Sequence, residues 1–293
     1  MKELETLGCL WTGEQDTDYV LCDGDIDLLP NLYQQDNIRY EYNQSNQSWS
    51  KKSCTIFMAI GMVSDLMNYE FSLKEIKEID ELSYEKGRTR WEWWYVKSAV
   101  DLVYKWWNTN DKLVKKYWKI AYYTIRKDST MIDEVLKKWY TIWWNFCPTI
   151  AYSKDYNTDA VLDWCEFGNK TSWHAIDIIW DENFNNRAVK DSYKGRRTYD
   201  NSKESNRYEL KHPIVDLTNY WSFYYVYTKV QEDNLEEIKR LNEIKSECNL
   251  IIDHLSGLWH KVNDTNFQGI LHYTAEKLRK KISDCNEQLK KYI

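Results

Sequence analysis

The sequence has little of what membrane, secreted and nucleic-acid-binding proteins require. In 293 residues no apolar run approaches the ~20 residues that a bilayer-spanning helix needs. The start, MKELETLGCLWTGEQDTDY, places acids where a secretory signal would have its apolar stretch, so we expect no export and a cytoplasmic location. The net charge of −6 argues against nucleic acid as a partner, because phosphate binding needs a concentrated basic face. These absences indicate a soluble protein of one large or two modest domains with no membrane association.

Signatures of metals, cofactors and disulfides are also missing. The 7 cysteines are odd in number and irregularly spaced, which fits reduced thiols better than a disulfide framework. No close pair of cysteine and histidine resembles a zinc site, and no glycine-rich loop could cradle a phosphate. A chain of this length buries enough apolar surface to fold without such supports. We therefore expect no metal and no cofactor.

Glycine is scarce and tryptophan is abundant. There are 9 Gly and 16 Trp, whereas ordinary usage of ~7% would give roughly 20 Gly. Some tryptophans stand where a backbone is expected to turn, as in LKKWYTIWWN, TSWHA and NQSWSKK. Either the protein is rich in tryptophan, or its source reads a stop codon as glycine that is written here as tryptophan. A peptide mass around Trp143 and Trp144 distinguishes the two hypotheses.

The first half of the sequence is predominantly helical after an extended start. Residues 1–43 favour short strands, turns or a wrapping arm. Apolar residues at helical spacing then predict an almost wholly buried helix that begins at or just before Cys54. A second helix is predicted in SLKEIKEIDELSYEKG, where Ser72 caps the start and Glu75 stands three residues on. The segments WYVKSAVDLVYKWW and TMIDEVLKKW favour two more helices.

The second half changes to strands and then returns to helix. Four short segments rich in β-branched and aromatic residues predict an antiparallel sheet: WHAIDIIWDE, RAVKDSYKG, NRYELKH and YWSFYYVYTKV. Two apolar stripes, separated by a break at 261–266, predict a C-terminal helical hairpin that packs on the body and offers a surface to a protein partner. The fold class is thus α+β. The expected organisation is a catalytic domain at 1–230, with a helical part at about 48–138 and a β part at about 139–230, followed by the hairpin at 231–293.

Cys54, His174 and Asp191 form a candidate catalytic set. A cysteine at a helix N-terminus lies at the positive end of the helix dipole, which stabilises a thiolate. An imidazole beside it would stabilise it further, and needs an acceptor on its other nitrogen to fix its tautomer. Asp191 follows His174 by 17 residues, about what two short strands and a turn consume. The remaining cysteines are expected to be inert packing.

The segments around these residues resemble the papain-like cysteine peptidases. NQSWSKKSCTIFMA is similar to the nucleophile segment of that family, in which a glutamine precedes a cysteine that opens the central helix. TSWHAIDIIW is similar to the histidine strand, VKDSYKG to the third motif, and DEVLKKWYTIWW to the helix and strand that lead into the β-lobe. The resemblance covers roughly residues 25–230 and leaves out the hairpin. It implies a two-lobed fold with the substrate cleft between a helical lobe and a β-lobe.

Carried over position by position, the resemblance makes Cys54 the nucleophile, His174 the general base and acid, and Asp191 the residue that orients the imidazole. Gln47 matches the side-chain donor of the oxyanion hole, whose second donor is the backbone N–H of Cys54. Tyr193 falls where the family has a tryptophan that shields the pair from water. The implied activity is hydrolysis of peptide or protein substrates by a cysteine-type peptidase through a thioester acyl-enzyme.

The chain departs from the family pattern at several positions. Gln47 lies seven residues before Cys54, one more than usual, which makes Gln44 an alternative donor. Further departures follow: an Asp at 191 in place of the usual Asn, an extra Lys194, and bulky Trp173 where a small residue normally precedes the histidine. Glycine at position 173 would remove the last of these. The alternatives to a peptidase are a transglutaminase-like or amidase-like thiol enzyme, and a catalytically inactive binding or assembly module.

Overall fold

The computed structural model of this chain describes most of the helices and strands that its pattern predicts. The residues described are 9–10, 20–21, 23–32, 40–44, 53–86, 94–110, 118–125, 129–146, 161–162, 174–181, 187–192, 207–210, 223–230, 234–262 and 264–292.

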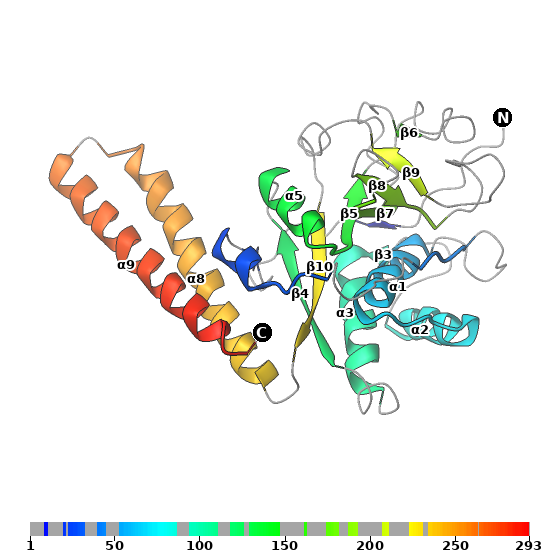
Figure 1. The fold of residues 1–293 in the computed structure, drawn as a ribbon. Coiled ribbons are helices and arrows are strands. Elements are labelled where there is room, and N and C mark those ends of the chain that lie inside the picture. The colour runs from blue at the N-terminus through cyan, green and yellow to red at the C-terminus, as the bar shows by residue number, and fades with distance from the viewer. Residues whose placement is uncertain are drawn as a thin grey trace.

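A mixed sheet of eight strands runs through the centre of the molecule (Figure 1). Its spatial order is β2 (Val20–Leu21), β4 (Lys119–Ile125), β10 (Phe223–Val230), β5 (Ile142–Phe146), β7 (His174–Ile179), β8 (Ala188–Lys190), β9 (Arg207–Leu210) and β6 (Val161–Leu162). The pairs from β4 through β9 are antiparallel, and β2 and β6 add parallel strands at the two edges. Strand β10, which follows the other described strands along the sequence, lies between β4 and β5.

Helices cover both faces of this sheet. The first group is α1 (Cys54–Met67), α2 (Leu73–Glu85) and α3 (Val96–Thr109), with β3 (Trp94–Tyr95) pairing β1 (Cys9–Leu10) beside it. The second is the short 3-10 helix η1 (Asp23–Leu28), α5 (Ser129–Lys137), and a hairpin of α8 (Leu235–Trp259) and α9 (Thr265–Leu289). Consecutive β4 residues show the division, because the Tyr122 hydroxyl donates to Asp101 of α3 and the Tyr123 hydroxyl accepts from Asn242 of α8.

Helix α1 is the centre of the core. All fourteen of its residues are buried, because it packs against α2 and α3 on one side and against β5, β7 and β10 on the other. The predicted start at Cys54 is confirmed. Its neighbour α2 begins with the predicted capping box, in which the Ser72 hydroxyl accepts from the Glu75 N–H and the Glu75 carboxylate accepts from the Ser72 N–H.

Among the described residues, the hairpin packs on the body of the protein at its base. Near β4 and η1, Ile238, Leu241, Cys285 and Leu289 pack with Leu28 and Val230 in a small apolar cluster. Farther out the predicted stripes are only partly covered: Cys248 and Leu271 are buried, but Ile251, Phe267 and Ile270 are exposed, as are Leu250 and Leu258 outside the stripes. Figure 1 shows the outer half of α8 and α9 extending away from the sheet.

The α+β class is confirmed, and most predicted elements are present. Several observed elements differ from the prediction. Strands β3 and β4 lie inside the range expected to be helical, and β6 was not predicted. Residues 23–28 form a 3-10 helix where extended chain was expected. In the part of the chain that the structure describes, no helix has the length and apolar character required to cross a membrane.

Candidate active site

Cys54 is the first residue of α1 and is fully buried. The residue before it, Ser53, does not cap the helix with its side chain but donates its hydroxyl to Asp80 of α2 at 2.7 Å. The Ser53 carbonyl accepts from the backbone N–H groups of Ile56 and Phe57, which closes the first turn. The start of α1 is thus fixed by α2, and Cys54 stands at the positive end of a buried helix dipole.

Helix α1 and strand β7 run in the same direction. At Gly61 the helix approaches β7 so closely that a Cβ atom would lie 2.8 Å from Oδ2 of Asp177. One turn later, Asp65 accepts from the hydroxyl of Thr141 at 2.5 Å. Thr141 directly precedes Ile142, which pairs with Ile178 of β7. The contacts therefore advance from Asp177 toward position 179 of β7 as the helix advances from Gly61 to Asp65, so the two elements run in the same direction.

This orientation brings the starts of the two elements to the same end. Cys54 lies two helical turns before Gly61, about 10 Å along the axis at 1.5 Å per residue. His174 lies three residues before Asp177, also about 10 Å at 3.3 Å per residue of strand. The backbone positions of Cys54 and His174 are therefore at similar levels of the α1–β7 pair. His174 is paired with Phe146 of β5, but its side chain lies outside the described residues.

Asp191 directly follows β8, the neighbour of β7, and is buried. In the β7–β8 register Lys190 stands opposite Asp177, so the next position, Asp191, falls opposite Ile176. Ile176 is two residues from His174 along the strand. In an antiparallel pair this makes 174 and 191 diagonal neighbours, a separation of about 7–8 Å between backbone positions.

Of the two candidate oxyanion donors, Gln44 is described and Gln47 lies outside the described residues, as do Trp173, Tyr193 and Lys194. Gln44 is buried, and its backbone N–H donates to the carbonyl of Ser192 at 2.8 Å. Ser192 is the residue after Asp191. The segment that carries both glutamines is thus joined to the segment that carries the candidate orienting carboxylate.

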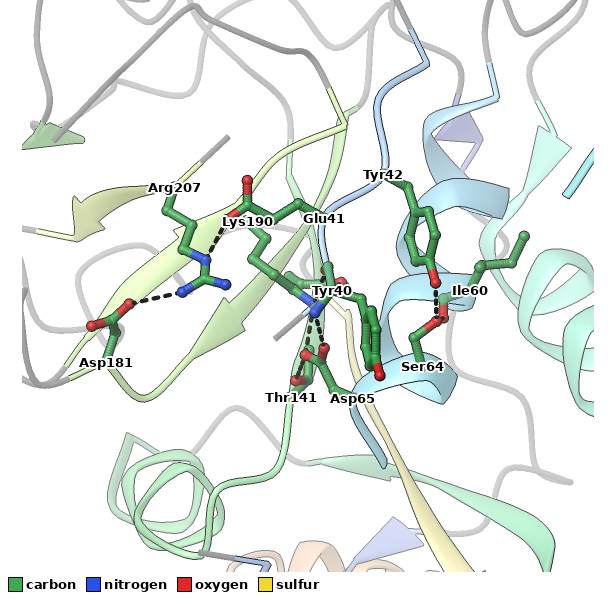
Figure 2. Close-up of polar contacts among 11 residues, drawn as sticks. Tyr40, Glu41, Tyr42, Ile60, Ser64, Asp65, Thr141, Asp181, Lys190 and Arg207 are labelled. Carbon is green, nitrogen blue, oxygen red and sulfur yellow. Dashed lines mark hydrogen bonds and ion pairs between the residues drawn. The ribbon is translucent and has the colours of Figure 1, made fainter. Parts of the chain in front are cut away.

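Nearly every residue of the 40–44 segment is tied to another element (Figure 2). The Tyr40 N–H donates to Asp65 at 2.9 Å, and Glu41 pairs with Arg207 of β9 at 2.5 Å. The Tyr42 hydroxyl lies 2.7 Å from the Ser64 hydroxyl, and it accepts from the Phe71 N–H at 2.8 Å. Burial raises the pKa of Tyr42, so this residue stays neutral. Residues 40–44 form no strand, and these contacts with side chains and backbone of other elements hold the segment in place across α1 and strands β8 and β9.

A buried ion cluster joins the helix to the strands. The Lys190 ammonium lies 2.6 Å from Oδ2 of Asp65 and 3.8 Å from Oδ2 of Asp177, and it donates to the Tyr40 carbonyl at 3.1 Å. The three charged side chains are each no more than 3% exposed. Figure 2 shows the Lys190 side chain reaching from β8 to Asp65 of α1 beside the 40–44 segment. Two carboxylates around one ammonium leave the cluster with a formal charge of −1.

This cluster was not predicted, although the sequence carries a signal for it. Asp65 stands in CTIFMAIGMVSDLM, Asp177 in HAIDII and Lys190 in AVK, each a single charge in an otherwise apolar element. Charges in elements that must be buried need partners, since an unpaired charge is very costly away from water. Opposite charges in such elements therefore predict a contact, here between α1 and the β7–β8 pair. Among the described residues no group of three or more His, Cys, Asp or Glu could hold a metal ion.

Comparison with known proteins gives one informative result. No protein-family model and no curated protein matches the sequence. Among solved structures, the fold matches xylellain, a cysteine protease from Xylella fastidiosa, with a TM-score of 0.50 and 13% sequence identity. The match covers 78% of this chain and 97% of the xylellain chain. This protein therefore has a fold similar to that of a cysteine protease, at low sequence identity.

Proposed function

We propose that this protein is a cysteine-type peptidase with a papain-like two-lobed fold. The observation that carries the proposal is the shared direction of α1 and β7, which brings Cys54 and His174 to one end, with Asp191 diagonal to His174 on the neighbouring strand. The order and placement agree with the resemblance carried by the sequence and with the fold of xylellain. A match over 78% of the chain is also compatible with a catalytic domain at 1–230 and a hairpin at 231–293 outside it.

In the proposed reaction the Cys54 thiolate attacks the carbonyl carbon of a peptide bond. The resulting oxyanion is held by the backbone N–H of Cys54 and by a glutamine amide, from Gln47 or Gln44. The His174 imidazolium gives its proton to the departing amine as the C–N bond breaks, which leaves a thioester. Water then gives a proton to His174 and attacks the thioester, releasing the acid and restoring the thiolate. Asp191 fixes the imidazole tautomer and stabilises its charged form.

The contacts of the 40–44 segment give this chemistry a rigid frame. Catalytic groups must be held to within fractions of an ångström of the productive geometry. The nucleophile comes from α1, the base from β7, the orienting acid from the end of β8, and the oxyanion donor from the loop after residue 43. Lys190, Asp65 and the Gln44–Ser192 hydrogen bond connect these four segments to one another.

The proposal is tested by incubating the reduced protein with an unfolded protein substrate and identifying new N-termini by mass spectrometry. Cys54→Ala and His174→Ala should abolish cleavage, and Cys248→Ser should not, because Cys248 lies in the hairpin away from the site. Asp191→Asn should retain more activity than Asp191→Ala, since an amide oxygen still accepts from the imidazole. Circular dichroism of each variant verifies that it is folded.

Other outcomes distinguish the alternatives. Release of ammonia from glutamine-containing peptides, without new N-termini, would indicate transglutaminase or amidase chemistry at the same cysteine. Absence of any turnover in a folded protein whose Cys54→Ala variant behaves identically would contradict the enzyme proposal and favour a binding or assembly module.

A further inference from the structure

Trp139 adopts a backbone conformation that tryptophan rarely takes. It lies two residues after the end of α5, with φ of 69°. Among the described residues, one other non-glycine position has positive φ, Asn68 at the end of α1, with φ of 49°. Asparagine is enriched in this left-handed region, whereas a bulky aromatic residue is an outlier because its Cβ crowds the backbone.

The position calls for glycine because of how α5 ends. The Trp139 N–H donates to the Leu136 carbonyl at 2.8 Å, and the Lys138 N–H donates to the carbonyls of Glu134 and Val135. The chain then reverses into Tyr140, which is buried, and into strand β5, whose residues 142–144 are buried. Termination by a left-handed residue just after the last helical turn is a very common end of an α-helix, and glycine is its usual residue.

A second tryptophan nearby packs its ring on Tyr225 but leaves its indole N–H unsatisfied among the described residues. Trp143 lies in β5 between β10 and β7, fully buried, and its indole N–H has no hydrogen-bond partner among the described residues. Buried indole N–H groups ordinarily find an acceptor. Trp107 shows the ordinary arrangement, since its N–H donates to the Trp118 carbonyl at 3.2 Å and its ring packs against Tyr69.

We infer that position 139 is glycine in the protein as its source makes it, and that the source reads as glycine a stop codon written here as tryptophan. The left-handed backbone at 139, the unpaired indole at 143 and the excess of 16 Trp over 9 Gly have this one explanation in common. The same substitution at Trp173 would give His174 the small preceding neighbour that papain-like peptidases have. Trp107, whose contacts use the indole, remains tryptophan under this inference.

The codons and one peptide test the inference. Trypsin cuts after Lys138 and Lys154 and so releases Trp139, Trp143 and Trp144 in one peptide. The inference expects UGA at codon 139, and a peptide mass from the source protein that corresponds to glycine there. A UGG codon at 139 would overturn it. So would a UGA codon whose peptide has the mass of tryptophan, since that codon is then read as tryptophan.

Unfolding of recombinant variants gives an independent test of the backbone argument. Trp139→Gly and Trp139→Ala remove the same indole, but only glycine relieves the left-handed conformation. The glycine variant should therefore have the higher midpoint of urea unfolding, with a several-fold larger folding equilibrium constant than the alanine variant. The same two substitutions at Asn68, which also has positive φ, give the stability difference between glycine and alanine at a left-handed position, and this difference is the reference for position 139. An alanine variant at 139 as stable as the glycine variant would contradict the assignment.

Discussion

The buried cluster of Lys190, Asp65 and Asp177 makes the sharpest prediction about stability. Replacing Lys190 by methionine keeps most of the side-chain volume and removes the ammonium that lies between two carboxylates. Both acids remain buried, and in the wild type the nearer one lies 2.6 Å from the ammonium. Lys190→Met therefore leaves charge behind in the core.

The expected magnitude follows from these distances. With an effective dielectric constant near 20, a pair at 2.6 Å attracts by about 6 kcal/mol, and the second carboxylate adds about 4 kcal/mol. Desolvation of each ion opposes this by several kcal/mol, so the net contribution is far smaller. Removing one partner of such a pair destabilises by about 3–5 kcal/mol, because the other charge stays buried and unpaired. That is a large share of the ~5–15 kcal/mol that a folded domain has.

The measurement is urea unfolding of Lys190→Met, Asp65→Asn and the double variant, with circular dichroism as the signal of unfolding. The double variant lacks one of the two carboxylates that Lys190→Met leaves behind. It should be about as stable as Lys190→Met or more so, which gives a coupling energy of about 1–3 kcal/mol. Lys77→Met is the matched control. Lys77 pairs with Glu81 at 3.5 Å, both more than half exposed, and should change stability by less than ~0.5 kcal/mol.

Two results would refute the reasoning. One is a Lys190→Met variant as stable as Lys77→Met. The other is strict additivity of Asp65→Asn and Lys190→Met, because that would mean the two groups do not interact in the folded protein.

Three further predictions concern other parts of the molecule. Gly61→Ala should destabilise the protein by about 1–3 kcal/mol, because its Cβ would lie 2.8 Å from Asp177. Gly269→Ala in α9, where a Cβ would meet no atom within 4 Å, should stabilise it by about 0.5–1 kcal/mol. Thermal unfolding that gives both variants the same change in stability would disprove the close approach at Gly61. Burial raises the pKa of the Cys248 and Cys285 thiols, so below their raised pKa they hold less thiolate than an ordinary thiol. Iodoacetamide should therefore label them slowly near pH 7 and faster as the pH rises, and peptide mapping across pH 6 to 10 that shows fast labelling at neutral pH would count against that burial. Leu241→Ala, at the anchored base of the hairpin, should lower the free energy of unfolding by about 2–5 kcal/mol, whereas Ile270→Ala, at the exposed end, should leave it almost unchanged. Equal losses of stability in urea unfolding would contradict anchoring at one end.

Local patterns in the sequence were sufficient to predict the elements that carry the candidate site. The apolar periodicity after Cys54 predicts α1, and Ser72 with Glu75 predicts the start of α2. Alternating and β-branched segments predict β7, β8, β9 and β10. In each case the signal lies in neighbouring residues: the spacing of apolar residues for the helix and strands, and the capping residues for α2.

Features that depend on distant partners could not be predicted in this way. Strand β4 begins beside the basic, aromatic segment LVKKYWK, and it is a strand because β10 and β2 pair with it from elsewhere in the chain. The outer apolar stripe of the hairpin has the same pattern as the buried base, but no other described element packs on it. Asp65 and Lys190 are 125 residues apart, so a lone charge in each apolar element indicates that it has a buried partner but does not fix the geometry of the contact. The relative placement of α1, β7 and β8 at the candidate site also depends on such distant partners, and therefore local patterns do not predict it.

The place of β10 in the sheet has a consequence for the newly made protein. Strand β10 lies between β4 and β5, although along the sequence it follows every other described strand of the sheet. Until residue 230 leaves the ribosome, the strands on either side cannot be joined, and α1 lacks part of the surface on which it packs. At ~5–20 residues per second, the delay after Cys54 emerges is on the order of ten seconds or more. A nascent chain therefore holds Cys54 apart from an assembled candidate site until β10 has been made, and the proposed peptidase activity is not expected before that point.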